Sequence, residues 1–277
     1  MKNILVPIEE HDSISAVLET AWRFAQGFDS RIEGIALGPD TGDLIAADFA
    51  IAGSIFDEKT RRELVEHSRG VFEAFMKTHG VPASGDAAPG PSFGWAGGDM
   101  STDSGIGAYG RVADIVVVGR PGSGRGDPRR ATLESVLFEA GRPILIAPPV
   151  APEKLGENIV IAWNGSTETA RTLGFVMPFL EQAQKITVVT VLKGNVPGPT
   201  AAELARNLQR SGLDVHWRET DPRDRSVGQA ILDESADLGA DLIVKGAYTQ
   251  SRLRQMIFGG ATSHILAEAT VPVVMAN

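Results

Sequence analysis

The sequence contains no cysteine among its 277 residues. That absence excludes disulfides, thiolate nucleophiles, zinc ribbons and iron–sulfur clusters, and it suits a reducing compartment. The sequence also lacks any apolar run of the roughly 18 residues that a membrane-spanning helix requires. Its first residues lead directly into a strand-like segment instead of a signal peptide. We therefore expect a cytoplasmic protein with no membrane partner.

Positive charge and histidine are both scarce. The 26 Lys and Arg residues are outnumbered by 35 Asp and Glu, which gives a formal net charge of −9. Sequence-independent nucleic-acid binding needs a basic surface, so we expect no nucleic-acid partner. No Gly-Lys-Ser/Thr string of a Walker A motif occurs, and the 5 histidines show no i, i+4 spacing. We therefore predict no catalytic residue and no metal site.

What the sequence does contain is two copies of one unit, which a comparison of the chain with itself reveals. Three strand-like segments recur in the same order: residues 3–8 and 158–163, 114–119 and 241–246, and 142–147 and 271–276. The proline-rich segment 148–156 lies between the copies and suits an extended linker. We therefore predict two tandem domains, residues 1–150 and residues 155–277.

Short apolar strands alternate with helical patterns in both copies, which indicates parallel sheets. We predict an α/β fold of two tandem doubly wound, Rossmann-like domains, each with a five-stranded parallel sheet. Ser13 is a candidate N-cap for the first helix. The predicted strands are 4–8, 31–37, 91–95, 115–119, 144–147, 159–162, 186–192, 214–219, 242–244 and 273–275. The predicted helices are 14–25, 57–79, 105–112, 132–140, 168–180, 201–210, 226–238 and 261–269.

Two segments are expected to pack against another surface. Residues 38–56 are apolar and rich in small residues for a loop, and a loop of that length is usually functional or packed. It lacks the basic flanks of a membrane contact, so we predict an interface between copies or subunits. The apolar strand 273–275 should lie at a sheet edge that is covered by dimerisation or by the other domain.

The stretch 241–277 carries the clearest chemical signal. A buried-type strand at 242–244 leads into a polar, cationic loop that ends at Gly259-Gly260, just before a predicted helix. Glycines before a helix allow backbone N–H groups to approach an anion, and the helix start adds partial positive charge. Glycines also stand at these places in many α/β proteins that bind no ligand. The spacing of the motif must therefore decide between the two interpretations.

Gly246, Thr249, Gly259-Gly260 and Thr262 resemble, in spacing, the nucleotide-binding signature of the universal stress protein family. That signature reads G-x-x-G, nine residues, then G and Ser or Thr. Thr249 stands where the family usually has its second glycine, and Gly260 stands where it usually has a hydroxyl residue. The resemblance covers nearly the whole chain as two tandem domains. It implies an adenine-nucleotide ligand, most commonly ATP.

Ligands of doubly wound sheets bind beyond the carboxyl ends of the strands, and the resemblance points to the same edge. In this family the residues after the first strand hold adenine and ribose, while the end of the second strand and the glycine-rich loop hold the rest. The implied nucleotide-binding residues are Ala162, Trp163, Asn164, Val191, Lys245, Gly246, Thr249, Gly259, Gly260, Ala261 and Thr262.

Three of these residues have an alternative interpretation. Asn164 replaces the aspartate of the family and offers one acceptor and one donor group, or it is simply a turn residue beside a helix N-cap at Ser166. Trp163 flanks the base or fills space. Lys245 interrupts an apolar strand, so it either contacts an anion or lines the purine slot with its aliphatic stem.

The first copy departs further from the family signature. Glu9 stands in place of the aspartate, and Ala131-Thr132 stand where the helix-opening glycine and hydroxyl residue belong. The arginines of its loop, Arg125, Arg129 and Arg130, either draw phosphate or form a solvated face, and we favour the solvated face. We therefore predict one nucleotide per chain, bound in the second copy.

These features favour an adenine-nucleotide-binding stress-response or regulatory protein. Its ligand is expected to be ATP, AMP or ADP, with Mg²⁺ only through the phosphates and with at most slow ATP hydrolysis. The alternative is an assembly module that binds no nucleotide and acts through its surfaces. A third hypothesis, an enzyme acting on an adenylated substrate, has no supporting acid–base set. We expect a homo-oligomer or an intramolecular pairing of the two domains.

Overall fold

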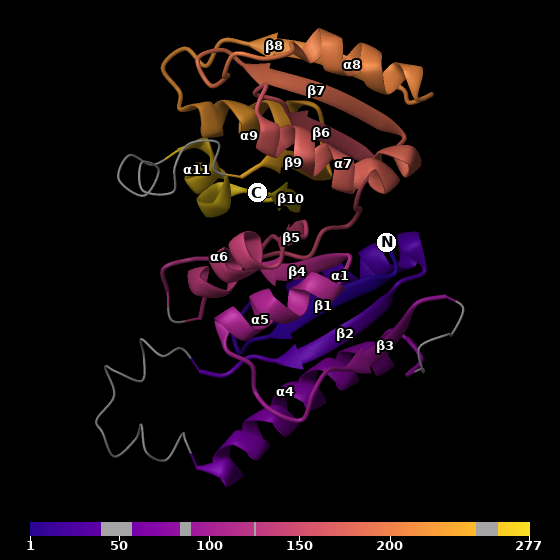
Figure 1. Cartoon of the computed structure of the whole chain (residues 1–277), viewed down its shortest axis with the longest axis vertical. Coiled ribbons are helices and arrows are strands. Elements are labelled where there is room, and N and C mark those ends of the chain that lie inside the picture. The colour runs from indigo at the N-terminus through magenta and orange to yellow at the C-terminus, as the bar shows by residue number, and fades with distance from the viewer. Residues whose placement is uncertain (40–56, 84–89, 125, 248–259) are drawn as a thin grey trace.

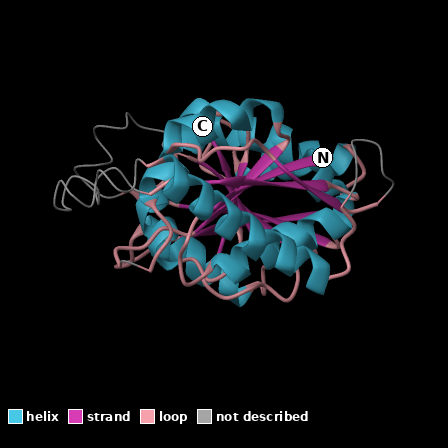
Figure 2. Cartoon of the chain, turned by 90° about the horizontal axis from the view of Figure 1, so that it is seen from below, coloured by secondary structure: helices cyan, strands magenta, loops and turns pink. Residues whose placement is uncertain are grey.

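The computed structural model describes residues 1–39, 57–83, 90–124, 126–247 and 260–277. Their strands form one sheet in the middle of the molecule, with helices on both faces (Figure 2). Figure 1 shows the first half of the chain at one end of the molecule and the second half at the other. Among the described residues, no helix is long and apolar enough to span a bilayer.

The first half contains five strands and their connecting helices. Its strands are β1 (Asn3–Ile8), β2 (Arg31–Ala36), β3 (Ser92–Trp95), β4 (Ile115–Gly119) and β5 (Ile144–Ala147). Its helices are α1 (Ile14–Phe28), α4 (Glu58–Thr78), α5 (Asp103–Tyr109), the 3₁₀ helix η1 (Gly110–Val112) and α6 (Arg130–Glu139).

The second half repeats this plan. Its strands are β6 (Asn158–Ala162), β7 (Lys185–Val191), β8 (Val215–Thr220), β9 (Leu242–Gly246) and β10 (Val273–Ala276). Its helices are α7 (Thr167–Gln182), α8 (Ala201–Arg210), α9 (Val227–Asp237) and α11 (Ala261–Glu268). The predicted elements all occur, within a few residues of the predicted ends, because each apolar run is long enough to cross the core once.

The strand order confirms the doubly wound fold. It also shows how the two halves pair, which the sequence left open. The order is β3-β2-β1-β4-β5-β10-β9-β6-β7-β8, and the strands within each half are parallel. β5 and β10 pair antiparallel, with Val274 opposite Leu145. The two five-stranded sheets are therefore joined edge to edge into one sheet of ten strands. The expectation that the strand at 273–275 is covered by the other half is confirmed.

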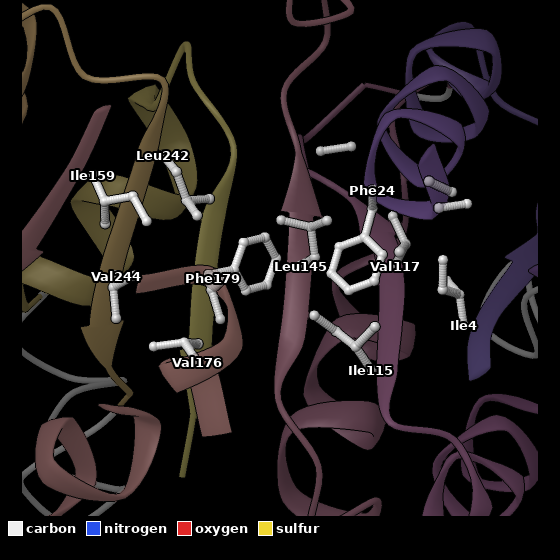
Figure 3. Close-up of a cluster of buried hydrophobic side chains, with 14 of the residues drawn as sticks. Ile4, Phe24, Ile115, Val117, Leu145, Ile159, Val176, Phe179, Leu242 and Val244 are labelled. Atoms are coloured by element: carbon white, nitrogen blue, oxygen red, sulfur yellow. The ribbon is translucent and has the colours of Figure 1, made fainter. Parts of the chain in front are cut away.

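Aromatic side chains at this junction merge the two hydrophobic cores. Phe24 of α1 and Phe179 of α7 lie with ring centroids 5.0 Å apart, next to Leu145 of β5 (Figure 3). Phe28 approaches Phe179 at the same centroid distance, 5.0 Å. Gln182 Nε2 also donates a hydrogen bond to the backbone oxygen of Gly27 at 3.2 Å. Separating the halves would expose these apolar surfaces, which opposes free movement of one half against the other.

The start of α1 differs from prediction in one detail. Ser13 occupies the N-cap position but makes no capping hydrogen bond through its side chain. Its hydroxyl instead lies 3.1 Å from Nδ1 of His11, which is 8% exposed. The side-chain cap proposed for Ser13 is therefore wrong, because a buried imidazole competes for the same hydroxyl.

Four parts of the sequence predictions lie outside the described residues. They are residues 40–56 of the 38–56 insertion, Arg125, Thr249 and Gly259. The domain boundary near residue 152 falls in the irregular segment between β5 and β6. It remains a prediction.

Candidate functional site

β6, β7 and β9 end at the same edge of the sheet and bring together most of the predicted site. Ala162 ends β6, Val191 ends β7, and Lys245 lies one residue before the end of β9. These residues and Trp163, Asn164 and Ala261 line one cavity of about 40 Å³. The cavity has five further lining residues, which sequence reasoning missed: Thr169, Val189, Gly194, Val227 and Ile231.

Four of the missed residues lie outside the strands: Thr169 on α7, Val227 and Ile231 on α9, and Gly194 in the connection after β7. They reach the cavity because α7 and α9 pack across the strand ends, and no local pattern in the sequence indicates that packing. Val189 is the exception, because it lies two residues before Val191 on the same strand and therefore faces the same side of the sheet. Strand periodicity could have identified it.

Lys245 dominates the electrostatics of the cavity. It is 8% exposed, and its Nζ donates to the backbone oxygen of Gly246 at 2.7 Å and to Thr262 Oγ1 at 2.8 Å. Both acceptors are uncharged. No carboxylate forms an ion pair with Lys245 in the described part of the chain, and residues 248–259 contain no Asp or Glu. Burial lowers the pKa of Lys245 from 10.5 to about 8, so the amine is still mainly protonated at pH 7.

Thr262 and the start of α11 complete the surroundings of the amine. Gly260 is the N-cap of α11 and has φ of −99°, a conformation open to other residues. Gly246 has a packing role, because a Cβ there would lie 2.3 Å from the backbone nitrogen of Thr169. Its own N–H donates to Thr169 Oγ1 at 3.3 Å. The glycine at the end of β9 therefore lets α7 approach the strand.

Asn164 forms the turn between β6 and α7. Its Oδ1 accepts hydrogen bonds from the Ser166 backbone N–H at 3.2 Å and from Thr169 Oγ1 at 2.8 Å. Ser166 caps α7, since its hydroxyl accepts from the Thr169 backbone N–H at 3.2 Å. Gly165 follows with φ of +80°, which only glycine adopts at little cost. The side-chain oxygen of Asn164 is thus used to hold the turn, as the interpretation of Asn164 as a turn residue predicts.

Trp163 is 6% exposed and belongs to the hydrophobic core. Its indole Nε1 donates to the backbone oxygen of Pro199 at 2.7 Å, which ties the connection after β7 to the end of β6. Trp163 therefore fills space and anchors a loop while one part of it borders the cavity.

The charge of the cavity favours nucleotide binding, whereas its size opposes it. A protonated amine without an anionic partner is costly to bury, so an anionic ligand group fits the amine. A volume of about 40 Å³ holds one or two water molecules. Pockets for nucleotide-sized ligands measure about 300 Å³ or more. A nucleotide base can enter only if the cavity widens.

The corresponding edge of the first half is filled by an ion pair. Arg129 Nε lies 2.7 Å from Glu9 Oε1, and both side chains are at most 14% exposed. Arg129 Nη2 also donates to the backbone oxygen of Gly38 at 2.9 Å. The interpretation of Arg129 as part of a solvated face is therefore wrong, because Glu9 draws the guanidinium inward. Arg130, in contrast, is exposed and pairs with Glu134 on α6 at 2.9 Å.

A roomier cavity of about 290 Å³ adjoins this ion pair, but its charge is unfavourable for anions. Three acids, Glu9, Glu10 and Asp127, line it together with Arg129. Burial raises the pKa of Glu9 in spite of the lowering effect of Arg129. A polyphosphate would meet more negative than positive charge there.

The two halves also differ at the positions of Lys245 and Thr262. Val118 precedes Gly119 at the end of β4 as Lys245 precedes Gly246, and Leu133 precedes Pro143 by as many residues as Thr262 precedes Pro272. Val118 is 5% exposed, Leu133 is 1% exposed, and both belong to the same apolar cluster. By this count the first half has buried apolar side chains at the positions that hold an amine and a hydroxyl in the second half. The neighbouring Thr132 keeps a buried hydroxyl, which donates to Asp103 Oδ1 at 2.6 Å.

Within the described residues, no cluster of three or more His, Asp or Glu side chains could hold a metal ion. The cavity residues of the second half include no acid, so Lys245 is the charged side chain that determines which ligand groups the site can accept.

Comparison with known proteins gives a consistent result. Residues 156–277 match the family model described as "Universal stress protein family". A universal stress protein of Synechocystis sp. is 23% identical over 172 residues, which cover 58% of this chain and 57% of the relative. The stress response protein NhaX of Bacillus subtilis is 30% identical over 74 residues, which cover 27% of this chain and 42% of the relative. The chain thus spans about half the length of the curated relatives it matches.

Solved structures share the fold over the whole chain. A universal stress protein from Archaeoglobus fulgidus superposes with a TM-score of 0.72 at 16% identity, over 99% of this chain and 96% of that one. A putative universal stress protein from Pseudomonas aeruginosa gives a TM-score of 0.55 at 14% identity, over 100% and 93% of the two chains. At these identities the similarity concerns the fold alone.

Proposed function

We propose that this chain, whose residues 156–277 match the universal stress protein family model, is an adenine-nucleotide-binding protein of a stress response. The nucleotide, ATP or a lower phosphate of adenosine, binds at the carboxyl edge of the second half. The names of the two curated relatives, a universal stress protein and a stress response protein, support the stress-response part of the proposal.

The observation that carries the proposal is the buried amine of Lys245, which has two uncharged acceptors and no carboxylate partner among the described residues. The first half shows that the same fold accommodates Val118 and Leu133 at the corresponding positions. The fold therefore does not need the polar pair. A buried charge that the fold does not need is best explained by an anionic ligand.

Each part of the nucleotide has a matching group at this edge. Lys245 and the backbone N–H groups at the start of α11, from Gly260 to Thr262, would hold phosphate oxygens. Ala162 and Val191 would contact the base and the ribose. Thr249 and Gly259, also implied by the family signature, lie outside the described residues. Any Mg²⁺ would be carried by the phosphates, since no acid lines the cavity.

The small cavity makes a second function worth testing. A volume of about 40 Å³ favours a protein that binds no nucleotide and acts as an assembly module through its surfaces. Under the first proposal, residues that line the cavity, such as Val191 and Val227, must move outward to admit the nucleotide. Nucleotide binding should then be accompanied by a measurable conformational change.

Native mass spectrometry and isothermal titration of the full chain distinguish the two functions. We expect a bound mass equal to one adenine nucleotide per chain, or a stoichiometry of one on titration with ATP. Binding to the Glu9→Gln protein should be unchanged, because that residue lies in the first half. The absence of any nucleotide complex at millimolar ATP would leave the assembly module as the function. Two equivalent sites per chain would contradict the assignment to the second half.

A further inference from the structure

β8 is the last strand of the sheet, and its outer edge has no strand partner among the described residues. Figure 1 shows β8 at one end of the molecule, opposite the end that contains β3. β3 has 4 residues, whereas β8 has 6. Of the two outer edges, β8 therefore offers the longer row of backbone donors and acceptors.

The hydrogen bonds to β7 determine which residues of β8 face outward. The backbone oxygen of Asp214 accepts a hydrogen bond from the Ile186 N–H of β7 at 3.3 Å. The backbone oxygen of Thr220 accepts one from the N–H of Leu192, the residue after β7, at 2.9 Å. The N–H and C=O groups of successive residues point alternately to the two sides of a strand. Asp214 and Thr220 face β7, so the odd-numbered residues between them point their backbone groups away from β7.

These outward-facing residues are Val215, Trp217 and Glu219. Gln209 of α8 donates from its side chain to the Val215 oxygen at 2.7 Å, which agrees with that direction. A carbonyl oxygen can accept a second hydrogen bond, so Val215 remains able to pair.

β8 carries two charged residues, Arg218 and Glu219, but it lacks most of the other features that usually block an open edge. Its sequence VHWRET contains no lysine, proline or glycine, and no bulge interrupts its register with β7. Trp217 is 51% exposed. Tryptophan is enriched in protein interfaces, and an exposed one on an unpaired strand is a suitable anchor.

We propose that β8 pairs antiparallel with β8 of a second copy of this chain, around a twofold axis. Opposite residues must both face outward or both face inward, so the twofold axis passes through one residue. The registers that keep most of β8 paired are centred on His216, Trp217 or Arg218. The register centred on His216 places Asp214 opposite Arg218 twice and Val215 opposite Trp217 twice. It is the register that we assign.

The other two registers contain no pair of opposite charge. Centring on Arg218 brings two guanidinium groups face to face. Centring on Trp217 places the two indoles opposite each other, but it leaves His216 opposite Arg218 and Val215 opposite Glu219. Cross-strand pairs of opposite charge stabilise a sheet, whereas like charges directly opposite each other destabilise it. Arg218 Nη1 already lies 2.9 Å from Glu234 Oε2, but the guanidinium has five N–H donors and the Arg218 side chain is 48% exposed. It can therefore reach Asp214 of the second copy as well.

A single strand pair buries a small area, so the dimer should be weak. Sedimentation velocity of the full chain from about 1 to 300 µM should show a monomer–dimer equilibrium. Trp217→Lys should weaken the dimer more than tenfold, since a lysine on the outer edge opposes pairing. Val112→Lys, a substitution of a residue that is 72% exposed in the first half, is the matched control and should leave the dimer unchanged.

A charge exchange tests the register. Arg218→Glu should weaken the dimer roughly tenfold, because it places acids opposite each other twice. The double substitution Asp214→Arg with Arg218→Glu restores opposite charges and should return most of the affinity. A urea titration of each variant checks that the subunit is folded. A monomer at all concentrations, a dimer insensitive to Trp217→Lys, or a double variant as weak as Arg218→Glu would each overturn the proposal.

Discussion

Replacing Lys245 by valine and Thr262 by leucine together should stabilise the ligand-free protein and abolish nucleotide binding. The double substitution copies into the second half the apolar pair Val118 and Leu133, which the first half already buries at 5% and 1% exposure. It removes a buried amine and its hydroxyl acceptor at once, so that neither of these two groups is left without the other. The backbone oxygen of Gly246 loses one donor.

The magnitude follows from the pKa of the amine. Burial lowers the pKa of Lys245 from 10.5 to about 8, which corresponds to about 3 kcal/mol of unfavourable free energy for the protonated form in the folded state. Imperfect packing of the new side chains should cost part of this gain. We expect the free energy of unfolding at pH 7 to rise by about 1–3 kcal/mol.

The single substitutions separate the contributions. Thr262→Leu alone takes one acceptor from a buried ammonium and should destabilise the protein by about 1–3 kcal/mol. Lys245→Val alone should be nearly neutral, because the gain from removing the charge is partly offset by the loss of a hydrogen-bond donor for the Thr262 hydroxyl. The double variant should therefore be more stable than either single variant, and the difference measures the coupling of the pair.

Urea denaturation and nucleotide titration of the four proteins provide the assay. Wild-type stability should rise as pH increases from about 8 to 10.5, because the unfolded chain keeps its proton longer than the folded amine does. The double variant should lack that rise. A double variant that is destabilised by 2 kcal/mol or more would show that the pair holds the fold together. Undiminished nucleotide binding would show that Lys245 is not the anion ligand.

Three further outcomes are expected. Affinity for ATP should fall as pH rises above about 8, where the folded Lys245 loses its proton; titration from pH 7 to 9.5 measures this, and a flat profile would contradict it. Arg129→Met should lower the free energy of unfolding by about 2–3 kcal/mol at pH 7 and by less at pH 4, because the pKa of Glu9 is raised by burial. Equal losses in urea titrations at both pH values would refute the ion-pair account. Stability should also fall as pH drops from about 6.5 to about 4, because burial lowers the pKa of His11 to about 4 and the unfolded chain takes up the proton first. His11→Gln should remove that part of the acid sensitivity in the same titrations.

The sequence by itself determined the elements, their order and the internal repeat. β4 and β9 are buried on both faces, so their apolar runs could be recognised without any tertiary information. The edge of the sheet at which a ligand would bind also followed, because parallel strands place their carboxyl ends together.

Only the tertiary structure decided which side chains meet at that edge. Lys245 and Thr262 are 17 residues apart, and Arg129 and Glu9 are 120 residues apart, so their contacts depend on strand register and helix placement. Local sequence patterns do not encode either. The same reason explains the small cavity, whose lining residues come from β6, β7, β9, α7, α9, α11 and the connections between them.

The joining of the halves was also decided by tertiary structure. The sequence showed that an apolar strand edge needed a partner, and it left open whether a second chain or the other half supplied it. The antiparallel pairing of β10 with β5 within one chain answers that question. It was settled by the packing of Phe24 and Phe179 across the junction, a contact between residues far apart in the sequence that stabilises one arrangement of the two halves.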